Sequence, residues 1–380
     1  MSNNIKNVTV TIIFEGSALN RDEKIGGNIL SIKKLNVNGE VRSFIGKPAI
    51  RHYLFQTLVK KDSQTWQPAP VTERGSGDKK TLQLDITRAD IVTSPELDVF
   101  GYMFTIEGER SLTRKAPLGI TKAISLASYE ADLAFYANHD LVMRRREEGY
   151  SETMPGLYNK EEHISFYKVS FTIDIDMMGK DVWILDQAPQ RQGNRLVLTI
   201  SSNDQKELHG NPDPNNPNRW NLDDKGTVEW TTNLHNKCKV TFQVAPQVKK
   251  ERTRAILEAI KNGLYAQSSG EANAIVPLFL IAGAVKVPSP IFHPYIDVRK
   301  EDGQWKVIGV GDALKNSWLE KDGDQLIVYI QDCDRLKVDN HWKGQALTDW
   351  TEFLKKLGLG GKKSNRKIKK LRRKARRPDR

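Results

Sequence analysis

The sequence contains few of the residues from which disulfide frameworks, zinc sites and nucleotide-binding loops are built. It has two cysteines, Cys238 and Cys333, which lie far apart and form no CxxC pair. This excludes a disulfide framework and a cysteine-based zinc site and fits a reducing compartment, so we expect a cytoplasmic protein. No P-loop, GxGxxG, HExxH or GxSxG motif is present, and the histidines are scattered without metal-ligand spacing. The sequence therefore predicts neither a cofactor nor a bound metal.

A long hydrophobic run is also missing. The most apolar stretch, residues 274–287, is interrupted by Pro277 and is too short to span a bilayer, so we interpret it as buried core. The opening residues, MSNNIKNVTV, have no apolar segment of the kind found in signal peptides. Because 38% of the residues are hydrophobic, the chain can still bury a core, and its 380 residues suffice for one large domain or two ordinary ones.

The positive charge is concentrated at one end of the chain. The formal net charge is +12, but residues 362–380 hold twelve Lys and Arg and a single acid, Asp379. This tail accounts for +11 and leaves the rest of the chain close to neutral. A nucleic-acid site on the body must therefore come from local basic patches, whereas the tail is either a nucleic-acid-binding arm or a solvated segment.

Hydrophobic periodicity predicts strands and helices separated by long insertions. The firmest elements are strands at residues 8–14 and 165–176 and a helix with Ile50, Leu54 and Leu58 on one side. Further strands are expected at 82–92, 196–200, 239–244 and 276–285, further helices at 126–136 and 252–264, and a loop at 209–226. The order strand, helix, insertion, strand, insertion, helix, strand is typical of a ferredoxin-like or RNA-recognition-motif (RRM) core.

Residues 19–58 have the clearest binding character. They connect the first strand to the first helix and carry Gly26-Gly27 together with several Lys and Arg side chains. A basic, glycine-bearing loop that enters a helix N-terminus favours phosphate, because the free N–H groups and the helix dipole add to the side-chain charge. An ordinary connection with solvated charges explains the pattern equally well.

Other segments fit nucleic-acid binding as well. Residues 110–122 form a second basic patch, and the Ser268-Ser269-Gly270 loop is a third place where backbone amides can approach phosphates. Met154, Leu157 and Tyr158 are apolar tips on a polar loop, able to wedge between RNA bases or to pack on their own domain.

Catalytic readings are weaker. Asp174 and Asp176 share one face of a predicted strand and could hold a metal, although a solvated strand face is the more frequent explanation. His52 beside Arg51 could act as a general base in RNA cleavage or simply contact phosphate. No coherent catalytic constellation emerges.

Several motifs occur in a specific order over most of residues 1–290. They are LNRD at 19–22, VRSFIGKPAIRHYLF at 41–55, FGYM at 100–103, RKAPLGITKAISL at 114–126, NHD at 138–140, MPGLYNKEEHISFYKVSF at 154–171, SSGEANA at 268–274 and VPLFLIAGAV at 276–285. In this order they resemble the Cascade backbone subunit of type I CRISPR systems, in particular the type I-B DevR-type autoregulator family of the RAMP superfamily.

The resemblance implies an α+β fold, with a ferredoxin-like/RRM palm, a helical fingers insertion and a thumb hairpin. It divides the chain into a first palm part with the gripping loop and helix (1–65), fingers (66–140), thumb (141–165) and a second palm part (166–361). A polar insertion at about 187–234 and the basic tail at 362–380 are not obvious parts of the family core.

The resemblance also implies a function. About six copies would stack in an open filament along one CRISPR RNA (crRNA). Each palm would grip phosphates and each thumb would kink the guide, which leaves short segments free to pair with target DNA. Other Cascade subunits would bind at the filament ends and along its belly. The residues that match the family positions for RNA binding are Asn20, Arg21, Ser43, Lys47, Arg51, His52, Met154, Leu157, Ser268, Ser269 and Asn273.

Three alternatives to a non-catalytic scaffold stay open. Related backbone subunits of type III complexes cut target RNA with an acidic loop residue, for which Asp22 or Glu23 is the candidate here. A guide-processing ribonuclease of the same superfamily would depend on a histidine. A generic RNA-binding protein would rely on its basic tail.

Overall fold

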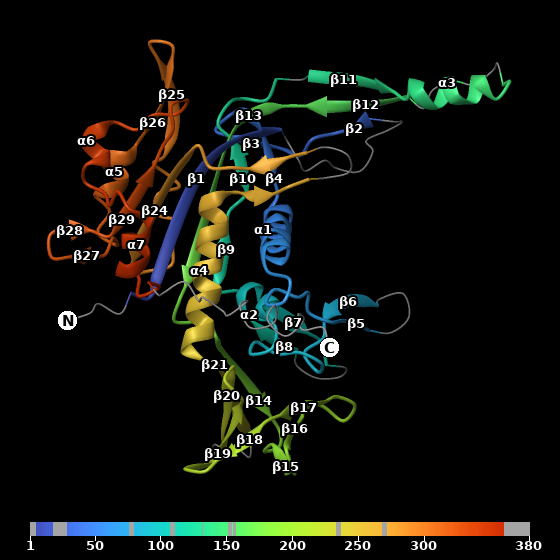
Figure 1. The fold of residues 1–380 in the computed structure, drawn as a ribbon, viewed down its shortest axis with the longest axis vertical. Helices are drawn as coiled ribbons and strands as arrows, with labels where there is room; N and C mark the ends of the chain where they lie inside the picture. Colours follow the sequence, from blue (N-terminus) through green and yellow to red (C-terminus); the bar gives the residue numbers. More distant parts are fainter. Residues whose placement is uncertain are drawn as a thin grey trace, which may run out of the picture.

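The computed structural model describes residues 5–17, 29–75, 80–106, 111–130, 132–150, 154, 157–232, 237–267 and 272–360. An antiparallel sheet at its centre joins strands from both ends of the chain (Figure 1). The strands follow in the order β29 (Val328–Gln331), β24 (Phe279–Val285), β1 (Asn7–Ser17), β13 (Ile164–Asp174), β10 (Ala123–Ser125), β4 (Glu40–Ile45) and β3 (Lys34–Val37), and β9 (Leu118–Ile120) also pairs with β13. The strands predicted at 8–14 and 165–176 are confirmed as β1 and β13, which pair from Asn7↔Asp174 to Ser17↔Ile164.

Three helices cover one face of this sheet: α1 (Lys47–Lys61), α4 (Pro246–Asn262) and α7 (Trp350–Lys356). The helices expected around Ile50 and at 252–264 are confirmed as α1 and α4. Leu54 of α1 and Ile260 of α4 are fully buried in one core with Val10 of β1. Burying such a side chain contributes about 1.5–3 kcal/mol relative to exposing it, so packing on the sheet stabilises these helices. No helix in the described ranges is long and apolar enough to cross a membrane.

The C-terminal part of the chain covers the opposite face. Its elements are β25 (Asp297–Glu301), β26 (Gln304–Ile308), α5 (Val310–Leu314), β27 (Lys321–Asp322), β28 (Gln325–Leu326) and α6 (Asn340–Lys343). Ile13 of β1 and Phe292 are fully buried in the core of this layer. The contact between β13 and this C-terminal layer is partly polar. Ser170 Oγ on β13 lies 2.8 Å from His293 Nδ1 in the layer and 2.6 Å from Thr11 Oγ1 on β1.

Two segments that are far apart in the sequence share a second hydrophobic core, below the central sheet in Figure 1. The first segment contributes β5 (Val71–Arg74), β6 (Thr81–Leu84), α2 (Pro95–Phe100), β7 (Tyr102–Phe104) and β8 (Leu112–Arg114). The second contributes β14 (Lys180–Leu185), β15 (Gln190–Gln192), β16 (Arg195–Thr199), β17 (Gln205–His209), β18 (Asn211–Asp213), β19 (Asn216–Leu222), β20 (Gly226–Thr232) and β21 (Cys238–Val244). Phe104 packs in the same core as Trp183 and Trp220, so the two segments form one structural unit.

Two expectations for this unit are wrong. Residues 209–226 are not a loop, because β18 and β19 lie within them and Trp220 and Leu222 point into the core. The tight turns between these short strands are rich in Asn, Asp, Pro and Gly, so the composition of the segment is typical of a loop. The strand expected at 82–92 is limited to β6; turns follow, in which Asp85 and Asp90 accept hydrogen bonds from the backbone N–H groups of Thr87 and Val92.

A long arm projects from the central sheet at the upper right of Figure 1. It consists of β11 (Asp132–Ala137), α3 (His139–Glu147) and β12 (Leu157–Glu162), with β2 (Ile29–Leu30) alongside β12. The helix expected at 126–136 is wrong, because residues 132–137 pair with β12 as a strand. Helix begins only after Asn138, whose side chain caps α3 by accepting a hydrogen bond from the Leu141 N–H.

These observations confirm a mixed α and β chain with antiparallel sheets and few helices. The expected helical character of residues 66–140 is not found: in the described part of this range, α-helix is limited to α2 and the first residues of α3. A small hairpin, β22 (Leu264–Tyr265) and β23 (Ala274–Ile275), completes the described elements after α4.

Candidate nucleic-acid interface

The N-terminus of α1 has no negative charge of its own. Gly46 precedes the helix without a side-chain cap, and the first turn contains no acidic residue. Pro48 fits this turn, because it has no N–H and its φ angle is already helical. The N–H groups of Ala49 and Ile50 already donate to the Gly46 carbonyl, so the attraction for an anion comes mainly from the helix dipole, which places a partial positive charge there.

Two lysines lie in the segments that flank one end of the β4–β10 pair. β10 pairs with β4 so that Ala123 lies opposite Ile45, and the pairing ends there. Lys122 directly precedes Ala123, and Lys47 follows Ile45 by two residues at the start of α1. Both lysines are exposed, and neither has an ion-pair or hydrogen-bond partner among the residues that the structure describes. One lysine from each of the first and second basic patches therefore lies within two residues of this strand pair.

Sequence reasoning assigned Lys122 to a basic patch but not to the binding site. The segments that carry Lys47 and Lys122 are far apart in the chain, and only the pairing of β4 with β10 brings them together. No local pattern in the sequence gives that pairing. Arg114, from the same basic patch, is instead buried and binds Asp98 at 2.9 Å, so it does not contribute charge to the surface.

Arg51 and His52 lie one turn further along α1. The Arg51 guanidinium donates to Glu96 Oε1 at 2.9 Å and lies 4.5 Å from the centre of the Phe100 ring. Arg51 therefore joins α1 to α2, and its charge is partly neutralised before any ligand binds. The His52 side chain is exposed to solvent.

Ser43 has a different environment. Its side chain is buried, and its Oγ lies 2.7 Å from His163 Nδ1 and 2.7 Å from the Tyr167 hydroxyl. Burial raises the pKa of Tyr167 to about 12 and lowers the pKa of His163 from its usual range. A contact between Ser43 and RNA would therefore have to use the backbone, since the hydroxyl is occupied inside the protein.

The loop between β22 and β23 starts from a hairpin that rests on α1. The Tyr265 N–H donates to Thr57 Oγ1 at 2.9 Å, and Lys60 lies 4.6 Å from the centre of the Tyr265 ring. Asn273 closes the loop through its carbonyl, which accepts from the Ala266 N–H, while its side-chain Nδ2 is buried without a partner among the described residues. The other predicted loop residues, Ser268 and Ser269, lie outside the described residues.

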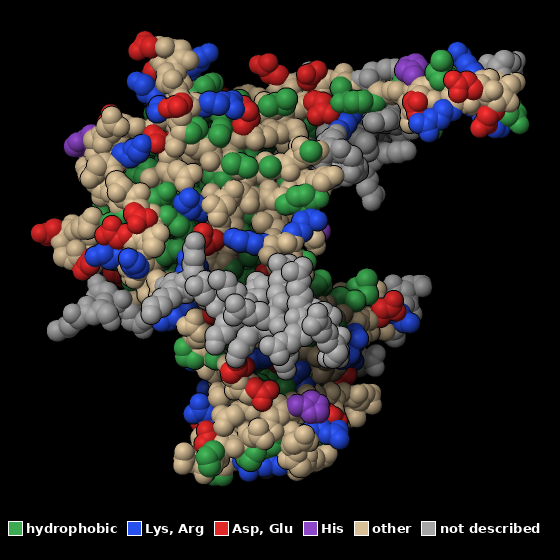
Figure 2. Space-filling view, viewed as in Figure 1, with side chains coloured by type: hydrophobic (Ala, Val, Ile, Leu, Met, Phe, Trp, Pro, Cys, Tyr) green, Lys and Arg blue, Asp and Glu red, His purple; other side chains and the backbone are tan. Residues whose placement is uncertain are grey.

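The predicted wedge residues lie on the arm. Met154 is 88% exposed, and Leu157 begins β12. The arm also exposes apolar side chains that sequence reasoning missed, namely Leu133, Leu141, Met143 and Tyr150. Asn20 and Arg21 lie outside the described residues, as does Asp22. Figure 2 shows a hollow between the arm and the unit that contains β5 and β6, and in Figure 1 α1 lies at its inner end.

The titratable residues offer little for catalysis. No group of three or more His, Cys, Asp and Glu side chains in the described ranges is placed to hold a metal ion. Asp174 accepts a hydrogen bond from the Met177 N–H at 2.9 Å, and Asp176 lies 3.5 Å from Lys6 Nζ. The pair considered for metal binding thus has a turn-forming and an ion-pairing role.

Comparison with known proteins connects this geometry to a family. A model of the family "CRISPR-associated negative auto-regulator DevR/Csa2" matches residues 8–303. A search of curated proteins gives no match. Two solved chains, titled "CRISPR RNA-guided surveillance complex" and "CRISPR RNA-guided surveillance complex, pre-nicking", are each 10% identical to this one. The first has a TM-score of 0.46 and covers 92% of this chain and 97% of its own; the second has a TM-score of 0.40 and covers 76% and 81%.

Those two TM-scores are too low for the solved chains to carry weight on fold or function. The family match, by contrast, extends over well more than half of the sequence and agrees with the family that the motifs indicate. The chain therefore belongs to the CRISPR-associated DevR/Csa2 family.

Proposed function

We propose that the protein is a non-catalytic backbone subunit of a type I-B CRISPR surveillance (Cascade) complex. Several copies bind one crRNA along its phosphate backbone and present kinked guide segments for pairing with target DNA. The observation that carries this proposal is the pairing of β4 with β10, which brings the segments of Lys47 and Lys122 to the start of α1, in a chain of the DevR/Csa2 family.

The strand order supports a ferredoxin-like palm. β24, β1, β13 and β9 are neighbours in that order, α1 follows β1, and α4 precedes β24. A βαββαβ unit of the ferredoxin-like type has this arrangement of two helices on one face of an antiparallel sheet. In the proposed palm, Lys47 and Lys122 form the surface that binds the guide, which we call the guide grip. It lies at the end of β4 and the start of α1 and faces solvent.

The arm supports the role of a thumb. It is a two-stranded ribbon that extends away from the sheet and exposes Met154. An apolar side chain that reaches into a stacked guide can separate neighbouring bases, and the phosphates on either side remain available to the palm. The hollow beside α1 in Figure 2 is where we place the guide.

The test is RNA binding by the full chain with the grip removed. Lys47→Ala and Lys122→Ala each take away one cation without a partner, so each should weaken binding of single-stranded guide RNA. Each should also lower the slope of log affinity against log salt by about 0.7, the value for one phosphate contact on a single strand.

The matched control is Lys300→Ala. Lys300 is also exposed and without a partner among the described residues, but it lies on β25, on the layer that covers the opposite face of the sheet. A loss equal to that of Lys47→Ala would mean that only total charge matters. Deleting residues 362–380 separates the tail: if that deletion abolishes guide binding while Lys47→Ala leaves it intact, the protein is a generic basic-tailed binder.

A further inference from the structure

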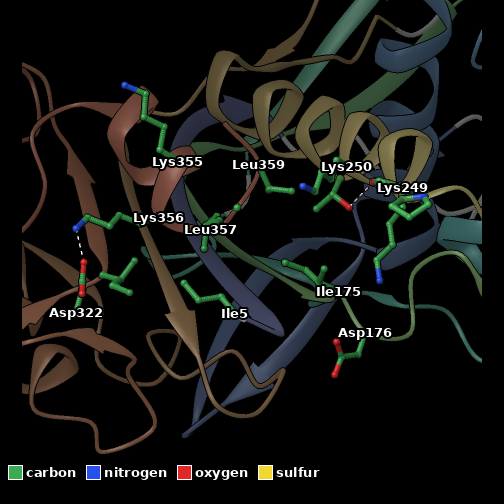
Figure 3. A pocket seen from close by; sticks show the side chains of 14 residues that line it. Ile5, Ile175, Asp176, Lys249, Lys250, Asp322, Lys355, Lys356, Leu357 and Leu359 are labelled. Carbon is green, nitrogen blue, oxygen red and sulfur yellow. Dashed lines mark hydrogen bonds and ion pairs between the residues drawn. The ribbon is translucent and has the colours of Figure 1, made fainter. Parts of the chain in front are cut away.

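A cavity of about 560 Å³ opens at the N-terminal end of α4 (Figure 3). It lies where the start of β1, the end of β13, the start of α4, the β27–β29 segment and the end of α7 meet, so five separate parts of the chain build it. Its floor is aliphatic, with Ile5, Ile327, Leu357 and Leu359 mostly buried and Ile175 partly open. The volume is within the range of ligand pockets and holds one or two aliphatic side chains.

The walls of this cavity carry several lysines, and the attraction of Asp176, Asp98 and Asp174 offsets only part of the effect of burial on the pKa of Lys249. Lys249 and Lys250 form one side, and Lys356 stands on the other, where it pairs with Asp322. Asp176 is paired with Lys6, so both acids of the cavity already have a partner. Lys249 and Lys250, in contrast, have no side-chain ion pair or hydrogen bond with any described residue.

The position of these two lysines is electrostatically unfavourable. They follow directly after the first turn of α4, which has no side-chain cap and no acidic residue. Cations near a helix N-terminus oppose the helix dipole. Burial also lowers the pKa of Lys249, because its charged form is partly removed from water. A bound anion would relieve both effects.

The residues that line the cavity favour an acidic peptide over a single-stranded nucleic acid. No aromatic side chain lines the cavity, so it lacks the stacking surface on which single-stranded nucleic acids place their bases. An acidic peptide with an aliphatic side chain can pack that side chain on the aliphatic floor and place its carboxylates beside the lysines of the walls.

We propose that this cavity is a docking site for an acidic segment of a partner protein, with a leucine-like side chain on the aliphatic floor and carboxylates beside Lys249 and Lys250. α4 has 17 residues and is about 25 Å long, and its other end leads to the β22–β23 hairpin next to α1. That hairpin rests on the C-terminal part of α1, through Thr57 and Lys60, and not on the helix start that carries Lys47.

The experiment uses a fluorescent peptide of glutamate and leucine, with one leucine replaced by the photoreactive residue benzoylphenylalanine, and the full-length protein without RNA. Crosslinks are expected on the segments that line the cavity, around Ile175 and Leu357. Lys250→Glu should weaken binding about tenfold, because an attraction of several tenths of a kcal/mol becomes a repulsion of similar size. Lys249→Gln should weaken it less.

Controls separate the cavity from the basic tail. Lys300→Glu makes the same change in net charge elsewhere and should leave the affinity unchanged. Replacing the leucines of the peptide by serine should weaken binding, because no apolar side chain is then buried against the aliphatic floor. Crosslinks confined to residues 361–380, or equal affinity for the leucine and serine peptides, would overturn the proposal. So would an oligo-dT strand that displaces the peptide from the cavity, which would assign the lysines to nucleic acid. None of these results bears on Lys47 and Lys122.

Discussion

Asp98 provides the sharpest prediction about stability. Its side chain is completely buried and holds three groups: Oδ1 accepts from Arg114 Nη2 at 2.9 Å and from the Gly179 N–H at 2.7 Å, and Oδ2 accepts from Arg252 Nη1 at 2.8 Å. Arg252 also binds the carbonyls of Ile91 and Val92. One carboxylate thus connects α2, β8, the turn before β14 and α4.

Asp98→Asn removes the carboxylate that binds both guanidinium groups and turns part of the acceptor into a donor. Asp181 Oδ1 stays 3.9 Å from Arg114 Nε, so Arg252 is the cation left without an acidic partner among the described residues. Leaving a buried cation without its partner costs about 3–5 kcal/mol. Since folded proteins are stable by about 5–15 kcal/mol in total, this is a large fraction of the free energy of unfolding. An unfolding entropy of about 2.1 cal/mol/K per residue gives about 1.3 °C per kcal/mol for a chain of 380 residues, so the melting temperature should fall by about 4–6 °C.

The assay is denaturant and thermal unfolding of the full chain, followed by circular dichroism. The control is Asp176→Asn, which removes an exposed carboxylate that lies 3.5 Å from Lys6 and should change the free energy of unfolding by less than about 0.5 kcal/mol. If Asp98→Asn is as mild as Asp176→Asn, the buried cluster does not hold these elements together and the reasoning is refuted.

Three further predictions concern pH, Ser43 and catalysis. Burial, with Lys168 nearby, lowers the pKa of His293 to about 4, so below pH 6.5 the unfolded chain takes up a proton before the folded chain does. The free energy of unfolding should therefore fall by about 1–2 kcal/mol from pH 7 to pH 5. In acid-unfolding curves, His293→Asn should flatten this pH dependence. Ser43→Ala should lower the free energy of unfolding by about 1–3 kcal/mol, because it removes the buried hydroxyl that lies beside His163 and Tyr167. The RNA affinity of the folded protein should stay the same. A loss of affinity without a loss of stability would instead show that the hydroxyl contacts RNA. Labelled target RNA incubated with the protein and Mg²⁺ should remain uncut, and cleavage that disappears in Asp22→Ala would contradict a non-catalytic scaffold.

The sequence predicted those elements whose pattern is local. β1 and β13 alternate over many residues, and α1 and α4 carry apolar side chains at helical spacing, so each was predicted in the right place. The spacing of Leu126, Tyr129 and Leu133 also fits a helix, yet residues 132–137 are a strand because β12 provides a partner along the whole arm. Pairing of this kind is a property of the tertiary structure and cannot be seen in a window of sequence.

The candidate site shows the same limit. Lys47 was predicted from the basic loop and the helix start that follow one another in the sequence. Lys122 completes the site only through the register of β10 with β4. Arg51 and Ser43 match the family motif, but the structure gives one of them an ion pair with Glu96 and the other a buried hydrogen-bond network. Residue type and order alone do not distinguish a free side chain from an occupied one.

The most direct test of the central proposal is the RNA that purifies with the protein when a CRISPR array is expressed beside it. If copies of this chain grip a guide through Lys47 and Lys122, the purified RNA should have a defined length, and nuclease treatment should cut it at a regular interval set by one subunit. Lys47→Ala combined with Lys122→Ala should strip the RNA from a protein that remains folded. RNA of random length without periodic protection, or full RNA occupancy in the double variant, would contradict the account.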